Sequence, residues 1–125
     1  MKFPMMILVR IGLGFTFLII GFMISLDPNG WAILIQPWIR DLIPYSTDEM
    51  MFAIAGFDMA IGILLILGIW TWLASLLGAL HIIGVLIVTG ITEITIRDIG
   101  LLAAAITLSI ETAPKEWHLF TDVKK

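Results

Sequence analysis

Five ionisable residues stand inside long apolar stretches of the sequence: Arg10, Asp58, His81, Arg97 and Asp98. A charge at the centre of a bilayer costs about 2.5–3.5 kcal/mol even on the most lenient insertion scale, so such groups normally turn inward and pair. The sequence therefore predicts a buried polar cluster, with a binding or a structural role, inside an apolar bundle.

The neighbours of these residues at helical spacing are small, and small residues let helices approach closely in membranes. Arg10 shares its helix face with Gly14 and Gly21, and Asp58 shares its face with Ala55 and Gly62. His81 shares its face with Ala74, Gly78 and Gly84, and Arg97 shares its face with Gly100 and Ala104. These four stripes predict one compact bundle with a polar centre.

Depth suggests which groups meet. Asp58 and His81 each lie about ten residues into an apolar stretch, near the middle of a bilayer at about 1.5 Å per residue, and could face each other. Arg97 is expected to reach inward to Asp58 and to stabilise its charged form, while Asp98 suits the dipole at a helix start. An interfacial anchor, with a snorkelling Arg97, is the alternative.

The other two residues also keep alternatives open. Arg10 could pair with Glu111, which shares the face of Arg97, or could snorkel to the membrane surface in a purely structural role. His81 could simply hydrogen-bond to a neighbouring helix.

Composition sets the environment of these residues. Hydrophobic residues make up 60% of the 125 and charged residues 14%, against about one quarter charged in soluble domains. The chain is therefore expected to be an integral membrane protein. Because a helix crosses a bilayer in about 20 residues, residues 1–125 have room for about four helices in a single domain. The apolar start is interpreted as a permanent span, since Arg10 interrupts it and no signal-cleavage site follows.

The breaks between apolar stretches predict an all-α fold, an integral membrane four-transmembrane-helix bundle with a short interfacial segment between helices one and two. The expected helices cover about 4–25, 47–69, 72–90 and 94–112, followed by a polar tail at 113–125. The second helix has a capping-box pattern at its start, formed by Ser46 and Glu49.

Residues 31–43 are apolar but too short to cross, and Pro37 interrupts them. We expect this segment at the outer interface, with Trp31 and Trp38 at the level of the headgroups. Its apolar surface exceeds what a solvated loop needs, so it is predicted to cover the mouth of the bundle or to meet a partner.

The positive-inside rule gives an orientation, because four crossings leave both termini on one side. That side holds Lys2, Arg10, Lys115, Lys124 and Lys125, and the other holds Arg40 and Arg97. The expected location is the cell (plasma) membrane, multi-pass, with both termini cytoplasmic.

Several motifs together resemble the DoxX family of small four-helix membrane proteins. They are RIGLGFTFLIIG at 10–21, DPxxW at 27–31, the acidic Asp58, GIWTWLA at 68–74 and IRDIGLLAAA at 96–105. The resemblance implies a place in a membrane redox system, since members include a subunit of archaeal thiosulfate:quinone oxidoreductase. It also implies that Arg10, Asp58, Arg97 and Asp98 occupy positions that the family keeps polar.

Three positions depart from the family pattern. Asp58 stands where glutamate is common in the family. Ser25 stands where a lysine often follows the first-helix glycine, and Trp72 stands where an arginine often follows the hairpin threonine. The loss of two cations argues against an anionic substrate.

The residues also limit what the chain can do alone. It contains no cysteine for an iron–sulfur cluster, and a membrane b-type haem usually needs two axial ligands where the bundle offers His81 alone. No Rossmann fingerprint or P-loop is present. We expect no metal site, no intrinsic cofactor, no nucleic-acid partner and no catalysis by the chain alone.

The resemblance favours a small integral membrane subunit of a membrane-bound oxidoreductase or oxygenase complex, which anchors or assembles partner subunits and reaches a quinone through the complex. Its partners would be the lipid bilayer and other membrane subunits or further copies of the chain. Two alternatives stay open: a small proton-coupled transporter using Asp58, and a ligand-free assembly protein.

Overall fold

A computed structural model describes residues 3–114, and every regular element in that range is a helix. Four helices are long and two are short: α1 (Phe3–Leu26), α2 (Pro28–Ala32), α3 (Pro37–Arg40), α4 (Thr47–Leu67), α5 (Thr71–Thr89) and α6 (Glu93–Thr112). The long helices begin and end within two residues of the positions expected from the sequence. Of the expected polar tail, residues 115–125 lie outside the described residues.

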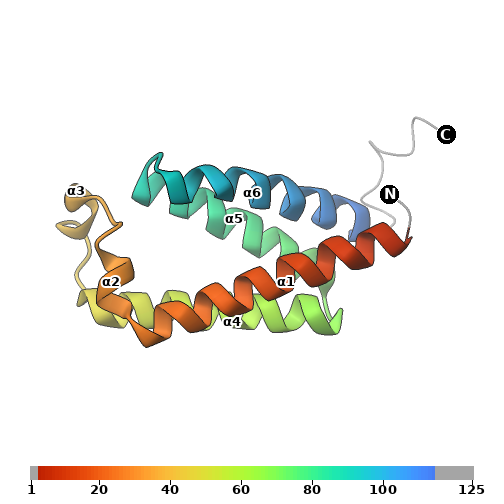
Figure 1. The fold of residues 1–125 in the computed structure, drawn as a ribbon, viewed down its shortest axis with the longest axis horizontal. Helices are drawn as coiled ribbons and strands as arrows, with labels where there is room; N and C mark the ends of the chain where they lie inside the picture. The colour runs from red at the N-terminus through yellow and green to blue at the C-terminus, as the bar shows by residue number, and fades with distance from the viewer. Residues whose placement is uncertain (1–2, 115–125) are drawn as a thin grey trace.

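The long helices lie side by side and alternate in direction, so that α1 begins and α6 ends at the same end of the bundle (Figure 1). They form two close pairs, α1 with α4 and α5 with α6, and contacts between the pairs are fewer. The short helices α2 and α3 cover the opposite end (Figure 1). This arrangement leaves space between the pairs under the short helices.

Glycines bring α1 and α4 into close contact, as the small-residue stripes predict. A Cβ on Gly62 would lie 2.6 Å from the carbonyl oxygen of Gly14, and one on Gly21 would lie 2.8 Å from the carbonyl oxygen of Ala55. Because these are backbone atoms, no side-chain rotation could relieve the overlap. The two helix backbones pack directly on each other along most of α4.

Local signals fix where the later helices begin. The hydroxyl of Ser46 accepts a 3.2 Å hydrogen bond from the backbone N–H of Glu49 at the start of α4. Helix α4 ends at Gly68, whose φ of 75° favours glycine. Thr92 and Thr95 form a capping box at the start of α6.

The stripe expected on α6 is wrong in its direction. Helix α6 turns Thr95, Ala105 and Leu108 into the bundle, whereas Arg97 is exposed and a Cβ on Gly100 would meet nothing within 4 Å. Adjacent residues on a helix point about 100° apart. Arg97 and its neighbour therefore cannot both face inward. The face that packs carries Thr95, Ala105 and Leu108, while large residues such as Ile96 and Ile99 stay exposed.

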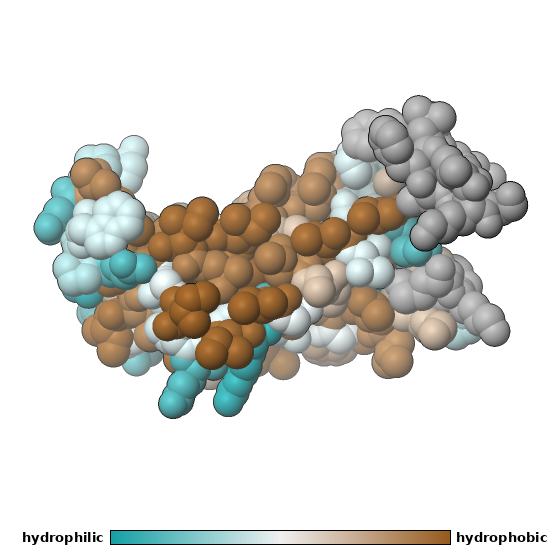
Figure 2. Space-filling view, turned by 90° about the horizontal axis from the view of Figure 1, so that it is seen from above, coloured by the Kyte–Doolittle hydropathy of each residue, from teal (hydrophilic) through white to brown (hydrophobic). Residues whose placement is uncertain are grey.

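Among residues 3–114, three helices are long and apolar enough to span a membrane, namely α1 from Pro4 to Leu26, α4 and α5. Helix α6 carries Glu93, Arg97, Asp98 and Glu111 within 20 residues, and its crossing stays a prediction. The all-helical class and an apolar, membrane-embedded surface are confirmed. Figure 2 shows apolar residues along the length of the bundle, with hydrophilic ones at the end that carries the short helices and others projecting from the side of the bundle.

Candidate functional site

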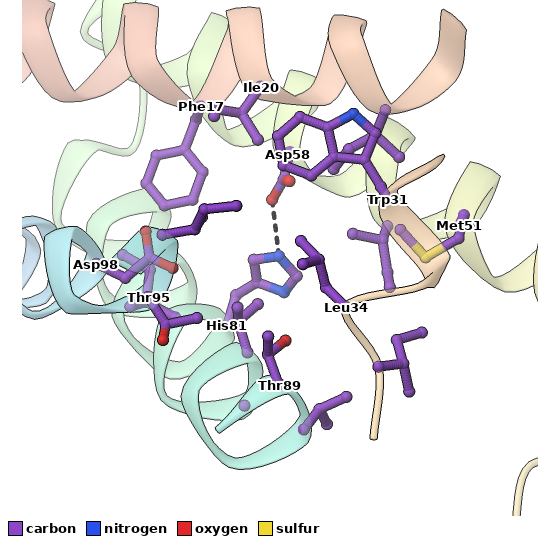
Figure 3. Close-up of a pocket in the computed structure, with 18 of the residues that line it drawn as sticks. Phe17, Ile20, Trp31, Leu34, Met51, Asp58, His81, Thr89, Thr95 and Asp98 are labelled. Atoms are coloured by element: carbon purple, nitrogen blue, oxygen red, sulfur yellow. Dashed lines mark ion pairs between the residues drawn. The ribbon is translucent and has the colours of Figure 1, made fainter. Parts of the chain in front are cut away.

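A cavity of about 370 Å³ lies between the two helix pairs. Helices α1, α4, α5 and α6 and the segment from α2 to α4 all contribute to its wall, which is mostly apolar. Phe17, Ile20, Leu34 and Met51 are among the apolar residues around it in Figure 3. Polar side chains that line it are Thr16, Asp58, His81, Thr89, Thr95 and Asp98.

Asp58 and His81 meet in the wall of this cavity. The Nε2 atom of His81 lies 2.8 Å from Oδ1 of Asp58 (Figure 3), so the two residues face each other as their depth in the helices predicts. Asp58 is only 4% exposed. The ring of Phe57 lies 5.2 Å from the imidazole, centroid to centroid, and is tilted by 59° to it.

The contact leaves much of the carboxylate unsatisfied. Although its distance suits an ion pair, the imidazole N–H is poorly aligned, and Asp58 Oδ1 has no hydrogen bond within residues 3–114. An ionised carboxylate can accept about four hydrogen bonds. A buried Asp58 with a single close partner is therefore ready to accept from water or from a ligand in the cavity.

The second carboxylate of the cavity comes from the opposite pair of helices. Asp98 lies on the inward face of α6, near Thr95, and lines the cavity (Figure 3). Arg97, beside it, is exposed and makes no ion pair with Asp58 in the described part of the chain. The expected Asp58–Arg97 pair is wrong, and His81 takes the place expected for the arginine.

Arg10 lies away from the cavity, at the end of the bundle where α4 turns into α5. Its guanidinium is packed against Gly68, where a Cβ would come within 2.7 Å of an Arg10 nitrogen. Its Nε atom is buried without a hydrogen bond, and none of the ion pairs found in residues 3–114 joins Arg10 to Glu111. A cation at the C-terminal end of α4 favourably meets the helix dipole, which supports the structural alternative.

The segment between α1 and α4 covers the cavity, as its apolar surface predicts. Trp31 lines the cavity, whereas Trp38 is 57% exposed and donates a 2.8 Å hydrogen bond to the side chain of Gln36. The backbone N–H of Gln36 donates to the carbonyl of Val88 at the end of α5, at 3.2 Å. This contact ties the cover to the second helix pair.

Sequence reasoning missed Gln36 and the threonines of the wall. Thr95 is 1% exposed and donates a 2.6 Å hydrogen bond to the carbonyl of Gly90. Its place three residues after Thr92 was a signal, because that spacing is typical of helix caps. For Gln36 the signal was a single polar amide side chain directly before Pro37 in an otherwise apolar segment. No group of three metal-ligating side chains occurs among residues 3–114.

In the part of the chain that the structure describes, all regular elements are helices, three of them are apolar spans, and a carboxylate–imidazole pair lies beside a cavity. These features define a small helical membrane protein. The family model named DoxX matches residues 5–92. This match covers well over half of the chain, which therefore belongs to the DoxX family. The matched range contains Asp58 and His81 and ends before Arg97. Comparison with curated proteins and with solved structures finds no match.

Proposed function

We propose that this protein is a small integral subunit of a membrane-bound redox complex, and that its cavity binds the headgroup of a lipid-soluble quinone. The chain contains no cysteine, and the long helices contain a single histidine, His81. Electron carriers would therefore belong to partner subunits. The role of this chain would be to anchor those subunits and to hold the quinone.

The observation that carries the proposal is the Asp58–His81 pair in the wall of a mostly apolar cavity. A quinone headgroup is an apolar ring with two polar oxygens, and sites for such molecules are apolar with few polar groups. The ring of Phe17 and the indole of Trp31 offer flat apolar walls. A cavity of about 370 Å³ suits a single ring with the beginning of its tail.

When bound, a quinone supplies two-electron chemistry that is coupled to protons. The chain's own residues would orient the headgroup and exchange protons with it. The imidazole of His81 can donate or accept at its ring nitrogens, and its Nε2 atom lies 2.8 Å from Oδ1 of Asp58. The apolar cover that includes Trp31 would keep bulk water out.

The same proposal includes an orientation in the plasma membrane. If α6 is a fourth crossing, α1 would begin and α6 would end on the same side of the membrane. The two ends lie at the same end of the bundle in Figure 1, which supports this arrangement. By the positive-inside rule this side would be the cytoplasm. The cavity and its cover would then lie toward the outer face of the membrane.

The test is quinone bound to the protein after purification from native membranes in mild detergent, measured by extraction and mass spectrometry. Gly84 lines the cavity and a Cβ there would meet nothing within 4 Å, so Gly84→Phe should fill the space and expel the quinone. Gly56 has the same open surroundings on the exposed face of α4, and Gly56→Phe is the matched control. Equal quinone in both variants, or none in the parent protein, would refute the site.

The same purification tests the complex. Partner subunits that carry flavin or metal should be present in fixed ratio to the chain. A chain that purifies alone and binds lipophilic cations through Asp58 would instead support the transporter alternative.

A further inference from the structure

The polar groups of the cavity accept more hydrogen bonds than they can donate. In their ionised forms Asp58 and Asp98 are acceptors alone, with about four acceptor positions each. The only close partner of either carboxylate in the described part of the chain is the imidazole of His81. The cavity therefore holds two carboxylates that are poorly supplied with donors.

Most donors in the wall are already used within the protein. The hydroxyl of Thr16 donates to the carbonyl of Gly12 at 2.9 Å, and that of Thr95 donates to a carbonyl at 2.6 Å. The Nε2 atom of His81 faces Asp58. In the described wall of the cavity, the hydroxyl of Thr89, the indole N–H of Trp31 and the second ring nitrogen of His81, when it carries a proton, are the remaining side-chain donors.

This imbalance bears on which redox form of a quinone the cavity holds. An oxidised quinone offers two carbonyl oxygens, which accept hydrogen bonds only, whereas the reduced quinol offers two hydroxyl groups, which donate. Placing an acceptor against a carboxylate that lacks donors leaves both groups without one, and that is costly. Placing a hydroxyl there satisfies both groups.

We propose that the cavity binds the quinol in preference to the quinone, with Asp58 on one helix pair and Asp98 on the other accepting hydrogen bonds from its hydroxyl groups. The proposal rests on the proposed function. It assigns to Asp98 a direct role in binding the ligand. This role goes beyond the favourable interaction of Asp98 with the dipole at the start of α6.

A lipophilic amine is the competing occupant, since it too brings donors to carboxylates. The geometry favours the quinol because the two carboxylates come from α4 and α6, which belong to different helix pairs. A quinol carries its donors at opposite edges of one ring. An alkylamine concentrates its donors and its charge at one end, whereas a quinol can present one hydroxyl group to each helix pair.

The experiment compares three ligands that share a decyl chain: a benzoquinol, the matching benzoquinone and the dimethyl ether of the quinol. Binding to the purified full-length protein in detergent is followed without oxygen by quenching of tryptophan fluorescence. The quinol should bind about tenfold more tightly than the other two, because hydrogen bonds to charged acceptors are strong. The ether has no donor and cannot be oxidised to the quinone, so it separates hydrogen bonding from redox chemistry.

Asp98→Asn should reduce this preference to about threefold or less, since an amide offers fewer acceptor positions and can itself donate to a quinone oxygen. Glu93→Gln makes the same change at an exposed position of α6 and should keep the full preference. Thermal unfolding of both variants checks that each is folded. Retained preference in a folded Asp98→Asn protein would overturn the role of Asp98.

The remaining outcomes separate the two proposals. Equal affinity for quinol, quinone and ether would overturn the preference and leave quinone binding intact. Absence of binding by all three would overturn the proposed function as well. Decylamine that binds more tightly than the quinol would overturn the preference in favour of an organic cation.

Discussion

Alanine at Gly62 should weaken the contact between α1 and α4, which positions Asp58 at the cavity. The new Cβ would lie 2.6 Å from both the carbonyl oxygen of Gly14 and the backbone nitrogen of Leu18. The helices would have to separate by about 1 Å to restore ordinary contact. Overpacking of this kind typically costs about 1–3 kcal/mol.

Gly56→Ala provides the matched control, because Gly56 lies in the same helix and a Cβ there would meet nothing within 4 Å. Both substitutions raise helix propensity by up to about 1 kcal/mol, so the difference between the variants isolates the contact. We expect Gly62→Ala to be less stable than Gly56→Ala by about 1–3 kcal/mol. The assay is reversible unfolding in detergent, followed by circular dichroism. Equal stability of the two variants would refute the close α1–α4 contact.

Two further predictions concern the site and its support. A double-mutant cycle on Asp58→Asn and His81→Gln should give a coupling energy of about 0.5–3 kcal/mol, because the two side chains touch. The same cycle with Arg97→Gln in place of the histidine change should be additive. Coupling between these two changes would contradict the structure and support an Asp58–Arg97 pair. Thr95→Val should cost about 1–3 kcal/mol in unfolding experiments by leaving buried backbone groups unpaired, whereas Thr107→Val, at an exposed position, should cost far less; equal losses would contradict the buried cap.

The sequence by itself determined the membrane environment and the helices. Runs of apolar residues and their breaks at Gly68 and Gly90 place the ends of α4 and α5, since these signals are local and need no neighbouring helix. The contact of Asp58 with His81 also followed, because depth in two antiparallel apolar helices limits which polar groups can meet.

Only the tertiary structure decided which face of α6 turns inward. Gly100 and Ala104 at helical spacing favoured the face of Arg97, and the face of Asp98 lies about 100° away. Packing selected the face of Asp98, where Ala105 and Leu108 are fully buried against the rest of the bundle. The rotation of a helix about its axis depends on the shape of all its neighbours. The cavity between the helix pairs also depends on tertiary structure, because it is the space left where α1, α4, α5 and α6 do not pack against one another.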